Sequence, residues 1–284
     1  MPTILSIQSS VAYGHVGNSA ATFPLMRLGV EVYPVYTVHY ASSTSYGPPR
    51  GPVLSPDEVA EVVTGVDERQ ALAGVDAVLT GYQGSQAMGQ TILDAVRTVR
   101  ERNPRAVYCA DPVMGDVGRG FFVAPGIPEL LRDEVVPAAD IVTPNQFELE
   151  FLTGRKVTTL AEVLAAADAL RAQGPGTVLV TSAQYQGTDP ATISMVAVSG
   201  DEAWGVQTPR LEPTFTGSGD ITAAVFLAGL LCSHSLREAL EQTAAVVYAV
   251  LKKTTDLGRR ELALVAAQDE IVAPSQTFQA ERLR

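Results

Sequence analysis

Short apolar runs alternate with helix-like segments along most of this chain. The runs are Pro2 to Ser9, Val30 to Val38, Ala77 to Thr80, Ala106 to Ala110, Ile141-Val142 and Thr177 to Val180. The segments between them repeat apolar residues at intervals of three and four, as in Asn18 to Leu28, which ends at Gly29. Strands that alternate with helices predict a parallel sheet that is covered on both faces.

The pattern changes in the last third of the chain. Ile193 to Val198 and Glu202 to Val206 are rich in β-branched residues and flank a Ser-Gly-Asp turn, which predicts an antiparallel hairpin. From Gly219 onward the sequence is mostly helical. Neither a Pro/Gly-rich linker nor an internal repeat divides the chain. We therefore expect one domain over residues 1–284, an α/β/α sandwich of three layers with a mostly parallel sheet and a late antiparallel hairpin.

Composition narrows the class of partner. A formal net charge of −11 repels polyanions and argues against nucleic acid, although backbone amides can still hold a small anion. No run approaches the roughly 18 unbroken apolar residues of a membrane-spanning helix, and the N-terminus lacks the features of a signal peptide. We expect a soluble cytoplasmic protein without membrane contact, whose two cysteines, Cys109 and Cys232, are buried structural thiols.

Polar side chains gather where the expected strands end. They lie directly after strands or in the loops that follow them: Ser10, Thr44, Tyr82, Asp111, Asn145 and Ser182. In parallel α/β sheets, ligands bind in the crevice outside the carboxyl ends of the strands. We therefore expect the ligand site at this edge.

A glycine-rich loop, Gly217-Ser218-Gly219-Asp220, opens an apolar helix. Small residues let backbone N–H groups converge at a helix N-terminus, where the dipole favours an anion. Asp220 would repel that anion, but it suits a base that takes a proton from an attacking hydroxyl during phosphoryl transfer. Gly-Asp before a helix is also ordinary capping chemistry. The segment alone leaves both readings open, and neither a P-loop nor a dinucleotide fingerprint occurs elsewhere.

Two further turns carry oxygen ligands. Asp111 and Asp116 lie in a Pro/Gly loop after a strand, and Asn145 and Glu148 lie in the next strand-to-helix turn. Such ligands suit Mg²⁺ that arrives with a nucleotide and needs only one or two protein carboxylates. The alternatives are turn-stabilising aspartates in the first case and a helix cap in the second.

The loop from Ser9 to Asn18 offers hydroxyls, two glycines and His15, to which we assign no role. Thr44, Ser45 and Tyr46 suit a polar aromatic ligand or a solvated surface loop. Tyr82 suits stacking on that ligand or packing against a helix. The arginines and lysines form no cluster, which favours solvated positions for most of them.

Taken together and in this order, these segments resemble the pyridoxal kinase family within the larger ribokinase-like group. The glycine loop and the two oxygen-rich turns are similar to features found broadly among ribokinase-like enzymes. The loop from Ser9 to Asn18 looks like the family's N-terminal substrate loop and is more particular to pyridoxal kinases, while Thr44-Ser45-Tyr46-Gly47 and Gly81-Tyr82 are similar to its second and third substrate segments. The resemblance covers nearly the whole chain.

This resemblance implies a site with three parts. Asp220 would take the proton of the substrate 5′-hydroxyl, and the amides of Gly217, Ser218 and Gly219 would form the anion hole. The pyridine ring would be held by Ser10, Thr44, Ser45 and Tyr82. ATP and Mg²⁺ would lie against Asp111, Asp116, Thr143, Asn145, Glu148, Thr181, Ser182, Thr214 and Thr216.

The sequence departs from the family pattern at two points. Thr181-Ser182 stands where some bacterial members carry a lysine, and Ser218 stands where threonine, valine or alanine is commoner. Both changes put nucleotide affinity in doubt, but neither removes a required chemical group. Members are commonly homodimers, so we expect a homodimer here.

The resemblance therefore implies MgATP-dependent phosphorylation of pyridoxal to pyridoxal 5′-phosphate. Two alternatives stay open at this point. A hydroxymethylpyrimidine kinase would share the fold and the anion hole. A non-enzymatic carrier of pyridoxal or its phosphate would bind the vitamer without consuming ATP.

Overall fold

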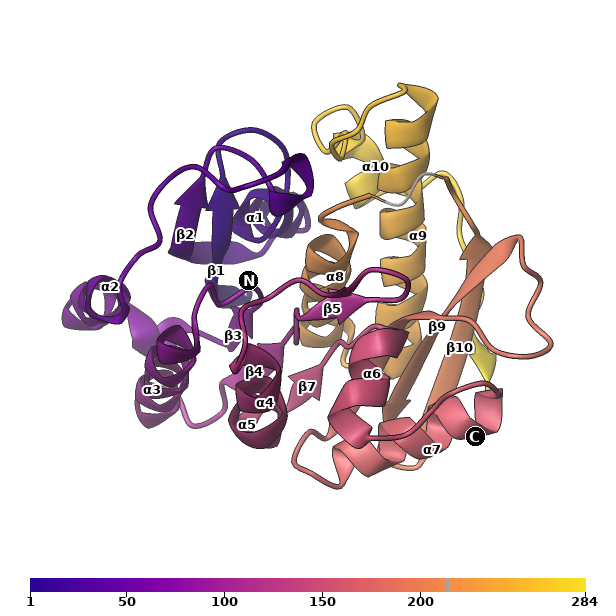
Figure 1. The fold of residues 1–284 in the computed structure, drawn as a ribbon, viewed down its shortest axis with the longest axis horizontal. Helices are drawn as coiled ribbons and strands as arrows, with labels where there is room; N and C mark the ends of the chain where they lie inside the picture. The colour runs from indigo at the N-terminus through magenta and orange to yellow at the C-terminus, as the bar shows by residue number, and fades with distance from the viewer. Residues whose placement is uncertain (213–214) are drawn as a thin grey trace.

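A nine-stranded sheet organises the computed structural model, which describes residues 1–212 and 215–284 (Figure 1). The strand order is β11-β10-β9-β8-β7-β4-β3-β1-β2. The strands are β1 (Thr3–Val11), β2 (Glu31–Tyr40), β3 (Ala77–Thr80), β4 (Val107–Ala110), β7 (Ile141–Val142), β8 (Thr177–Ala183), β9 (Thr192–Ser199), β10 (Glu202–Pro209) and β11 (Glu281–Arg282). Pairing is parallel from β2 through β8 and antiparallel from β8 through β11.

Helices cover both faces of this sheet. One face carries α2 (Pro56–Glu68), α3 (Gln86–Arg102), α4 (Ile127–Leu130), a π-helical turn (Leu131–Val135), α5 (Val136–Ala138), α6 (Gln146–Thr153) and α7 (Leu160–Arg171). The other face carries α1 (Asn18–Arg27), α8 (Ser218–Ser233) and α9 (Leu236–Asp256), with α10 (Gln268–Val272) packed outside them. An apolar core fills the space between the sheet and each helical layer. The expected α/β/α sandwich with its late antiparallel hairpin is confirmed.

Asn18 fixes the point at which the loop after β1 returns to the sheet. Its side chain is buried at the start of α1, and Nδ2 lies 3.1 Å from the carbonyl oxygen of Ser6 and 2.9 Å from that of Val35. The amide therefore donates to β1 and β2 together. Because buried carbonyl groups need such partners, the end of the loop is tied to both strands.

Several features differ from the sequence-based expectation. A small hairpin, β5 (Gly115–Asp116) and β6 (Gly120–Phe121), and the edge strand β11 were not predicted. Cys109 is buried as expected, but Cys232 is exposed, so the prediction of two buried thiols was wrong for Cys232. The reason is that α8 is apolar nearly throughout, so its sequence does not reveal which residues of its last turn leave the core. Within the described ranges, no helix has the length and apolar character needed to cross a membrane.

Close packing of α8 against α9 provides a test of the fold. At Gly229 of α8, an added Cβ would lie 2.9 Å from Cα of Ala239. We expect Gly229→Ala to lower the free energy of unfolding by about 1–3 kcal/mol because the helices must separate. Gly65 of α2 is the matched control, since no atom lies within 4 Å of its added Cβ, and Gly65→Ala should stabilise by about 0.5–1 kcal/mol. Urea unfolding measures both, and equal stability of the two variants would contradict the packing described.

Candidate active site

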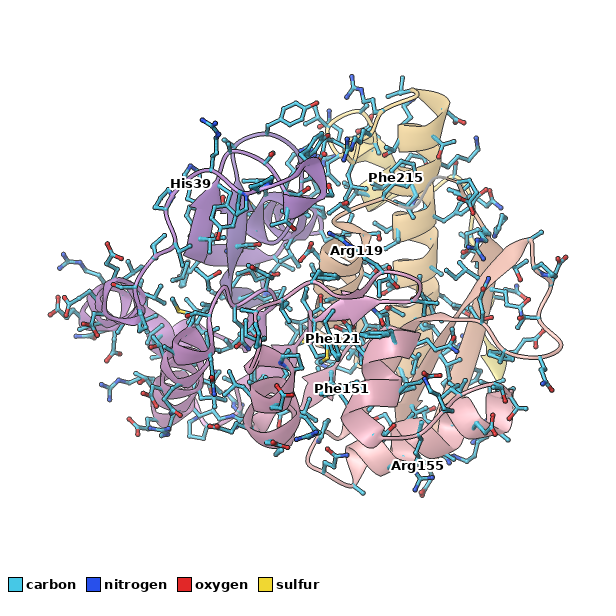
Figure 2. The ribbon with its side chains drawn as sticks, in the orientation of Figure 1. His39, Arg119, Phe121, Phe151, Arg155 and Phe215 are labelled. Carbon is cyan, nitrogen blue, oxygen red and sulfur yellow. The ribbon has the colours of Figure 1, made fainter. Side chains whose placement is uncertain are left out.

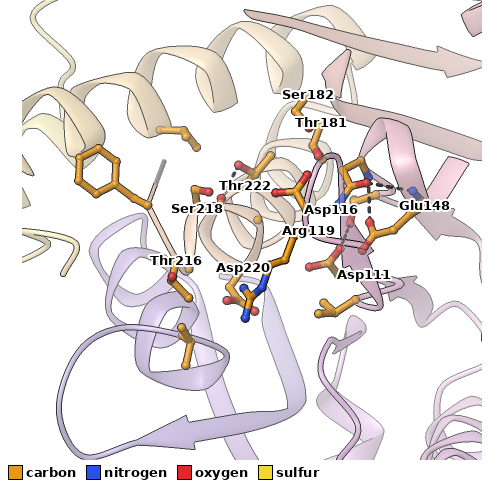
Figure 3. Close-up of a pocket in the computed structure, with 18 of the residues that line it drawn as sticks. Asp111, Asp116, Arg119, Glu148, Thr181, Ser182, Thr216, Ser218, Asp220 and Thr222 are labelled. Carbon is orange, nitrogen blue, oxygen red and sulfur yellow. Dashed lines mark hydrogen bonds between the residues drawn. The ribbon is translucent and has the colours of Figure 1, made fainter. Parts of the chain in front are cut away.

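A cavity of about 820 Å³ opens at the carboxyl edge of the parallel strands. Its walls come from the ends of β1, β2 and β8, the loops after β3, β4 and β7, and the N-terminus of α8 (Figure 3). Strands β9 and β10 and helix α9 close the far side. The cavity therefore lies at the edge where the sequence predicted the ligand site.

Most of the residues predicted for the site line this cavity. They are Thr44, Tyr82, Asp111, Asp116, Thr143, Asn145, Glu148, Thr181, Ser182, Thr216, Gly217, Ser218, Gly219 and Asp220. Thr214 lies outside the described residues. Segments separated by more than a hundred residues in the sequence thus meet around one space.

Ser10 and Ser45 are not among the lining residues, whereas their neighbours are. Ser9 faces the cavity, and the Ser10 hydroxyl lies 3.3 Å from that of Ser19. Ser43 also faces the cavity, and its hydroxyl lies 2.7 Å from that of Ser45. The substrate-binding roles of Ser10 and Ser45 stay predictions.

The glycine-rich loop places amide groups at one end of the cavity. Gly217 is the N-cap residue of α8 with φ 91°, and a Cβ at this position would overlap the carbonyl oxygen of His15. Glycine is therefore required by both backbone conformation and close approach. The following amides open α8, where the unpaired N–H groups and the dipole favour negative charge.

Asp220 stands in the first turn of α8, not at its cap. The helix-cap alternative thus does not describe this residue. Burial raises the pKa of Asp220 to about 6, while the amides of Gly17 and of Asp220 itself oppose the rise. A carboxylate with this pKa is largely ionised at neutral pH and still basic enough to accept a proton.

Glu148 and Asn145 form the capping box that the sequence left as an alternative. Glu148 accepts from the amides of Met114 at 3.0 Å and Asn145 at 2.9 Å, and the Asn145 side chain accepts from the Glu148 amide. Nδ2 of Asn145 also donates to the carbonyl oxygen of Gly115 at 2.8 Å. Both residues also line the cavity, so the same two side chains cap α6 and face the cavity.

Asp111 is a buried carboxyl group close to the glycine loop. Thr143 Oγ1 donates to its Oδ1 at 3.1 Å, and an added Cβ on Gly219 would lie 3.9 Å from its Oδ2. Burial, with the charges of Glu148 and Asp220, raises the pKa of Asp111 well above its usual range. Burial likewise raises the pKa of Glu148 to about 8. A cation would relieve this accumulation of negative charge.

These residues fit a nucleotide-borne magnesium ion better than a resident metal. Among the described residues, no group of three or more His, Cys, Asp or Glu side chains is arranged to hold a metal. Mg²⁺ needs only one or two carboxylates when water and phosphate oxygens complete its shell. Asp111 has an oxygen free of protein hydrogen bonds in the described part of the chain, whereas Glu148 uses both of its oxygens for backbone amides.

Sequence reasoning missed a hairpin residue that reaches the cavity, Arg119. It lies between β5 and β6, and its guanidinium stands 4.7 Å over the ring of Phe122. Phe121 packs edge-on against Phe147 and Phe151 with centroids 5.0 and 5.1 Å apart, which holds the hairpin on α6 (Figure 2). Figure 3 shows the Arg119 side chain extending into the site.

The apolar far end of the cavity was also missed. It is lined by Ile193, Met195, Pro209, Leu211, Phe215, Val247, Tyr248 and Leu251, with Arg210 beside them. In sequence these residues read as ordinary hairpin and helix positions. Their patterns carry no signal that separates a cavity wall from a core.

Comparisons with known proteins agree on one family. The sequence model described as phosphomethylpyrimidine kinase matches residues 59–264. Proteins called pyridoxal kinase PdxY from Leifsonia xyli subsp. xyli and Rubrobacter xylanophilus are 54% and 56% identical, over 99% of this chain and 99% and 97% of theirs. A solved pyridoxal kinase from Leishmania donovani, in complex with ADP and pyridoxamine, is 30% identical and covers 100% of both chains with a TM-score of 0.92. The chain therefore belongs to the pyridoxal kinases, within the wider family that the phosphomethylpyrimidine kinase model describes.

Proposed function

We propose that this chain is an ATP-dependent pyridoxal kinase that phosphorylates the 5′-hydroxyl of pyridoxal. The observation that carries the proposal is Asp220 in the first turn of α8, beside the amides of the glycine loop and within one cavity with Asp111. The relatives named pyridoxal kinase PdxY and the Leishmania donovani enzyme with ADP and pyridoxamine support the same reaction.

Each part of the cavity has a task in this reaction. Asp220 accepts the proton of the 5′-hydroxyl as that oxygen attacks the γ-phosphoryl group. The amides of Ser218 and Gly219 stabilise the charge that develops on the transferred group. Ser10, Thr44, Ser45 and Tyr82 hold the pyridine ring, of which Thr44 and Tyr82 line the cavity. The nucleotide lies along Thr143, Thr181, Ser182 and Thr216, and Thr214 is proposed beside them from the sequence alone.

We propose that Mg²⁺ enters the site together with the nucleotide. It shields the phosphate charges when bound, and Asp111 is the carboxylate that would contact it. Asp116, Asn145 and Glu148 would act on its water shell. The crowding of buried carboxyl groups around Asp111 supports this assignment, because their raised pKa values favour a nearby cation.

The domain organisation, oligomeric state and location of the enzyme are also proposals. We infer a single domain over residues 1–284, a homodimer and a cytoplasmic location. The net charge of −11 supports a protein that does not bind nucleic acid. A hydroxymethylpyrimidine kinase is the second candidate function, since the matching family model is described as phosphomethylpyrimidine kinase.

Asp220→Asn tests the proposed base. The substitution keeps the shape of the side chain but removes its capacity to accept a proton. We expect kcat to fall by about 10²–10⁴-fold, with little change in ATP binding. Asp201→Asn, in the exposed turn between β9 and β10, is the matched control and should behave as the unsubstituted protein. Turnover of Asp220→Asn near that of the control would refute the role of Asp220.

The raised pKa of Asp220 predicts a pH dependence. The ionised carboxylate is the active form, so kcat/KM falls as pH drops through the pKa of about 6. An aspartate with the ordinary pKa of about 4 would keep its activity to lower pH. A pH–rate profile, corrected for the ionisation of pyridoxal and ATP, measures this midpoint. A profile that stays flat down to about pH 5 would contradict the assignment.

A substrate panel separates the candidate functions. Pyridoxal, pyridoxine, pyridoxamine and hydroxymethylpyrimidine are assayed with MgATP under one set of conditions. We expect kcat/KM for pyridoxal to exceed that for hydroxymethylpyrimidine by about tenfold or more, because the two rings place different polar groups against the same walls. The reverse order would favour the second function, and vitamer binding without ADP formation would favour a carrier.

A further inference from the structure

One carboxylate near the C-terminus bridges the two loops that border the substrate end of the cavity. Glu261 Oε1 accepts from the Tyr46 hydroxyl at 2.7 Å, and Glu261 Oε2 accepts from the amide of His15 at 3.0 Å. Tyr46 lies in the 3₁₀ turn after β2 (Thr44–Tyr46), and His15 lies in the loop after β1. In the sequence, 215 and 246 residues separate these partners from Glu261.

Arg260 also contacts the turn that contains Tyr46. Its guanidinium stands 3.7 Å over the ring of Tyr46, a cation–π geometry, and its Nη2 donates to the carbonyl oxygen of Ser45 at 2.8 Å. Tyr13 adds an edge-on contact to the Tyr46 ring with centroids 5.9 Å apart. Both loops are thus fastened to residues 260 and 261.

Residues of the loops after β1 and β2 form part of the cavity wall. Thr44, two residues before Tyr46, lines the cavity together with Ser43, as does Val16, which immediately follows His15. The carbonyl of His15 itself stands against Gly217, where it excludes any side chain. Of the two partners of Glu261, Tyr46 is therefore two residues from the wall residue Thr44, and His15 contacts the glycine loop itself.

The segment that supplies these two residues is anchored to the core. We call residues 259–264 the C-terminal bracket. Its last three residues are buried, and Leu262 and Leu264 belong to the core that α1, α8, α9 and α10 share. The amide of Ala263 donates to Thr254 Oγ1 of α9 at 2.9 Å, and α9 also lines the far end of the cavity through Tyr248. Figure 1 shows the yellow bracket region beside the indigo loops that follow β1 and β2.

We infer that Glu261 and Arg260 are positioning residues for pyridoxal, which close the loops after β1 and β2 over the substrate end of the cavity. This inference rests on the proposed function. Arg260 and Tyr46 are exposed, and exposed polar contacts add little to global stability. Their effect falls instead on the fraction of molecules whose loops are closed, and apparent substrate affinity scales with that fraction.

Both hydrogen bonds to Glu261 can persist near neutral pH. The hydrogen bond to Glu261 raises the pKa of Tyr46 to about 12, so the phenol remains a donor throughout the neutral range. Burial lowers the pKa of His15, although the charge of Glu261 opposes this shift, so the imidazole is mainly neutral at pH 7. The contact from His15 uses its backbone amide, which does not titrate.

Steady-state kinetics of four variants test the inference. Tyr46→Phe removes the hydroxyl and keeps the ring, Glu261→Gln removes the charge, and Arg260→Ala removes the cation. Arg259→Ala, an adjacent exposed arginine of the same bracket, is the matched control. We expect KM for pyridoxal to rise about tenfold in Glu261→Gln, as the closed fraction drops to about a tenth. KM for ATP and the melting temperature should stay close to those of Arg259→Ala.

A double variant and an exchange measurement complete the test. If Tyr46 acts through Glu261, the double variant Tyr46→Phe/Glu261→Gln has the KM of Glu261→Gln alone. Amide hydrogen exchange in the free protein should speed up at residues 11–17 and 43–47 in Glu261→Gln, a readout that requires no activity. An unchanged pyridoxal KM, or a parallel rise in both KM values with a lower melting temperature, would overturn the inference. An unsubstituted protein that does not phosphorylate pyridoxal would instead refute the proposed function.

Discussion

The contact between Gly217 and the carbonyl of His15 is the constraint on which the site depends. It joins the loop after β1 to the N-terminus of α8, and a side chain at position 217 would force them apart. Because of this contact, the amides of the glycine loop and the loop after β1 are held side by side. Asp220 follows within the same turn of α8, so in the proposed function its distance from the substrate is set by the same contact.

Negative charge is the second constraint, since Asp111, Glu148 and Asp220 share one cavity. Burying carboxyl groups together is costly, and the structure offsets the cost in different ways. Glu148 is held by backbone amides and caps α6, whereas Asp220 is held by the amides of Gly17 and its own residue. Asp111 receives only one hydroxyl, and burial with the charges of Glu148 and Asp220 keeps its pKa well above the usual range. This uncompensated negative charge is the physical reason to place a cation beside Asp111.

Much of this could be predicted from the sequence because parallel strands end at one edge. Asp111 and Asn145 follow strands and Ser182 lies near the end of β8, so their meeting at a common cavity required no knowledge of side-chain contacts. The side of β1 that faces the cavity was not predictable. The pairing of β1 with β2 shifts register between Gln8 and Ser10, and such an irregularity changes which residue of a strand points to a given face.

The remaining features depend on contacts between distant segments. Strands β5 and β6 have two residues each, too few to show any periodicity, so Arg119 read as a solvated loop residue. Glu261 reads as an ordinary polar residue before an apolar run, and its two partners lie more than two hundred residues away. A single sequence contains no local signal for such pairs.

If the cavity directs phosphate onto the 5′-oxygen of pyridoxal, product analysis is the most direct test. The protein is incubated with pyridoxal and MgATP, and the products are identified by mass spectrometry and phosphorus NMR. We expect one pyridoxal 5′-phosphate for each ADP formed. ADP that appears with inorganic phosphate and unchanged pyridoxal would contradict this function.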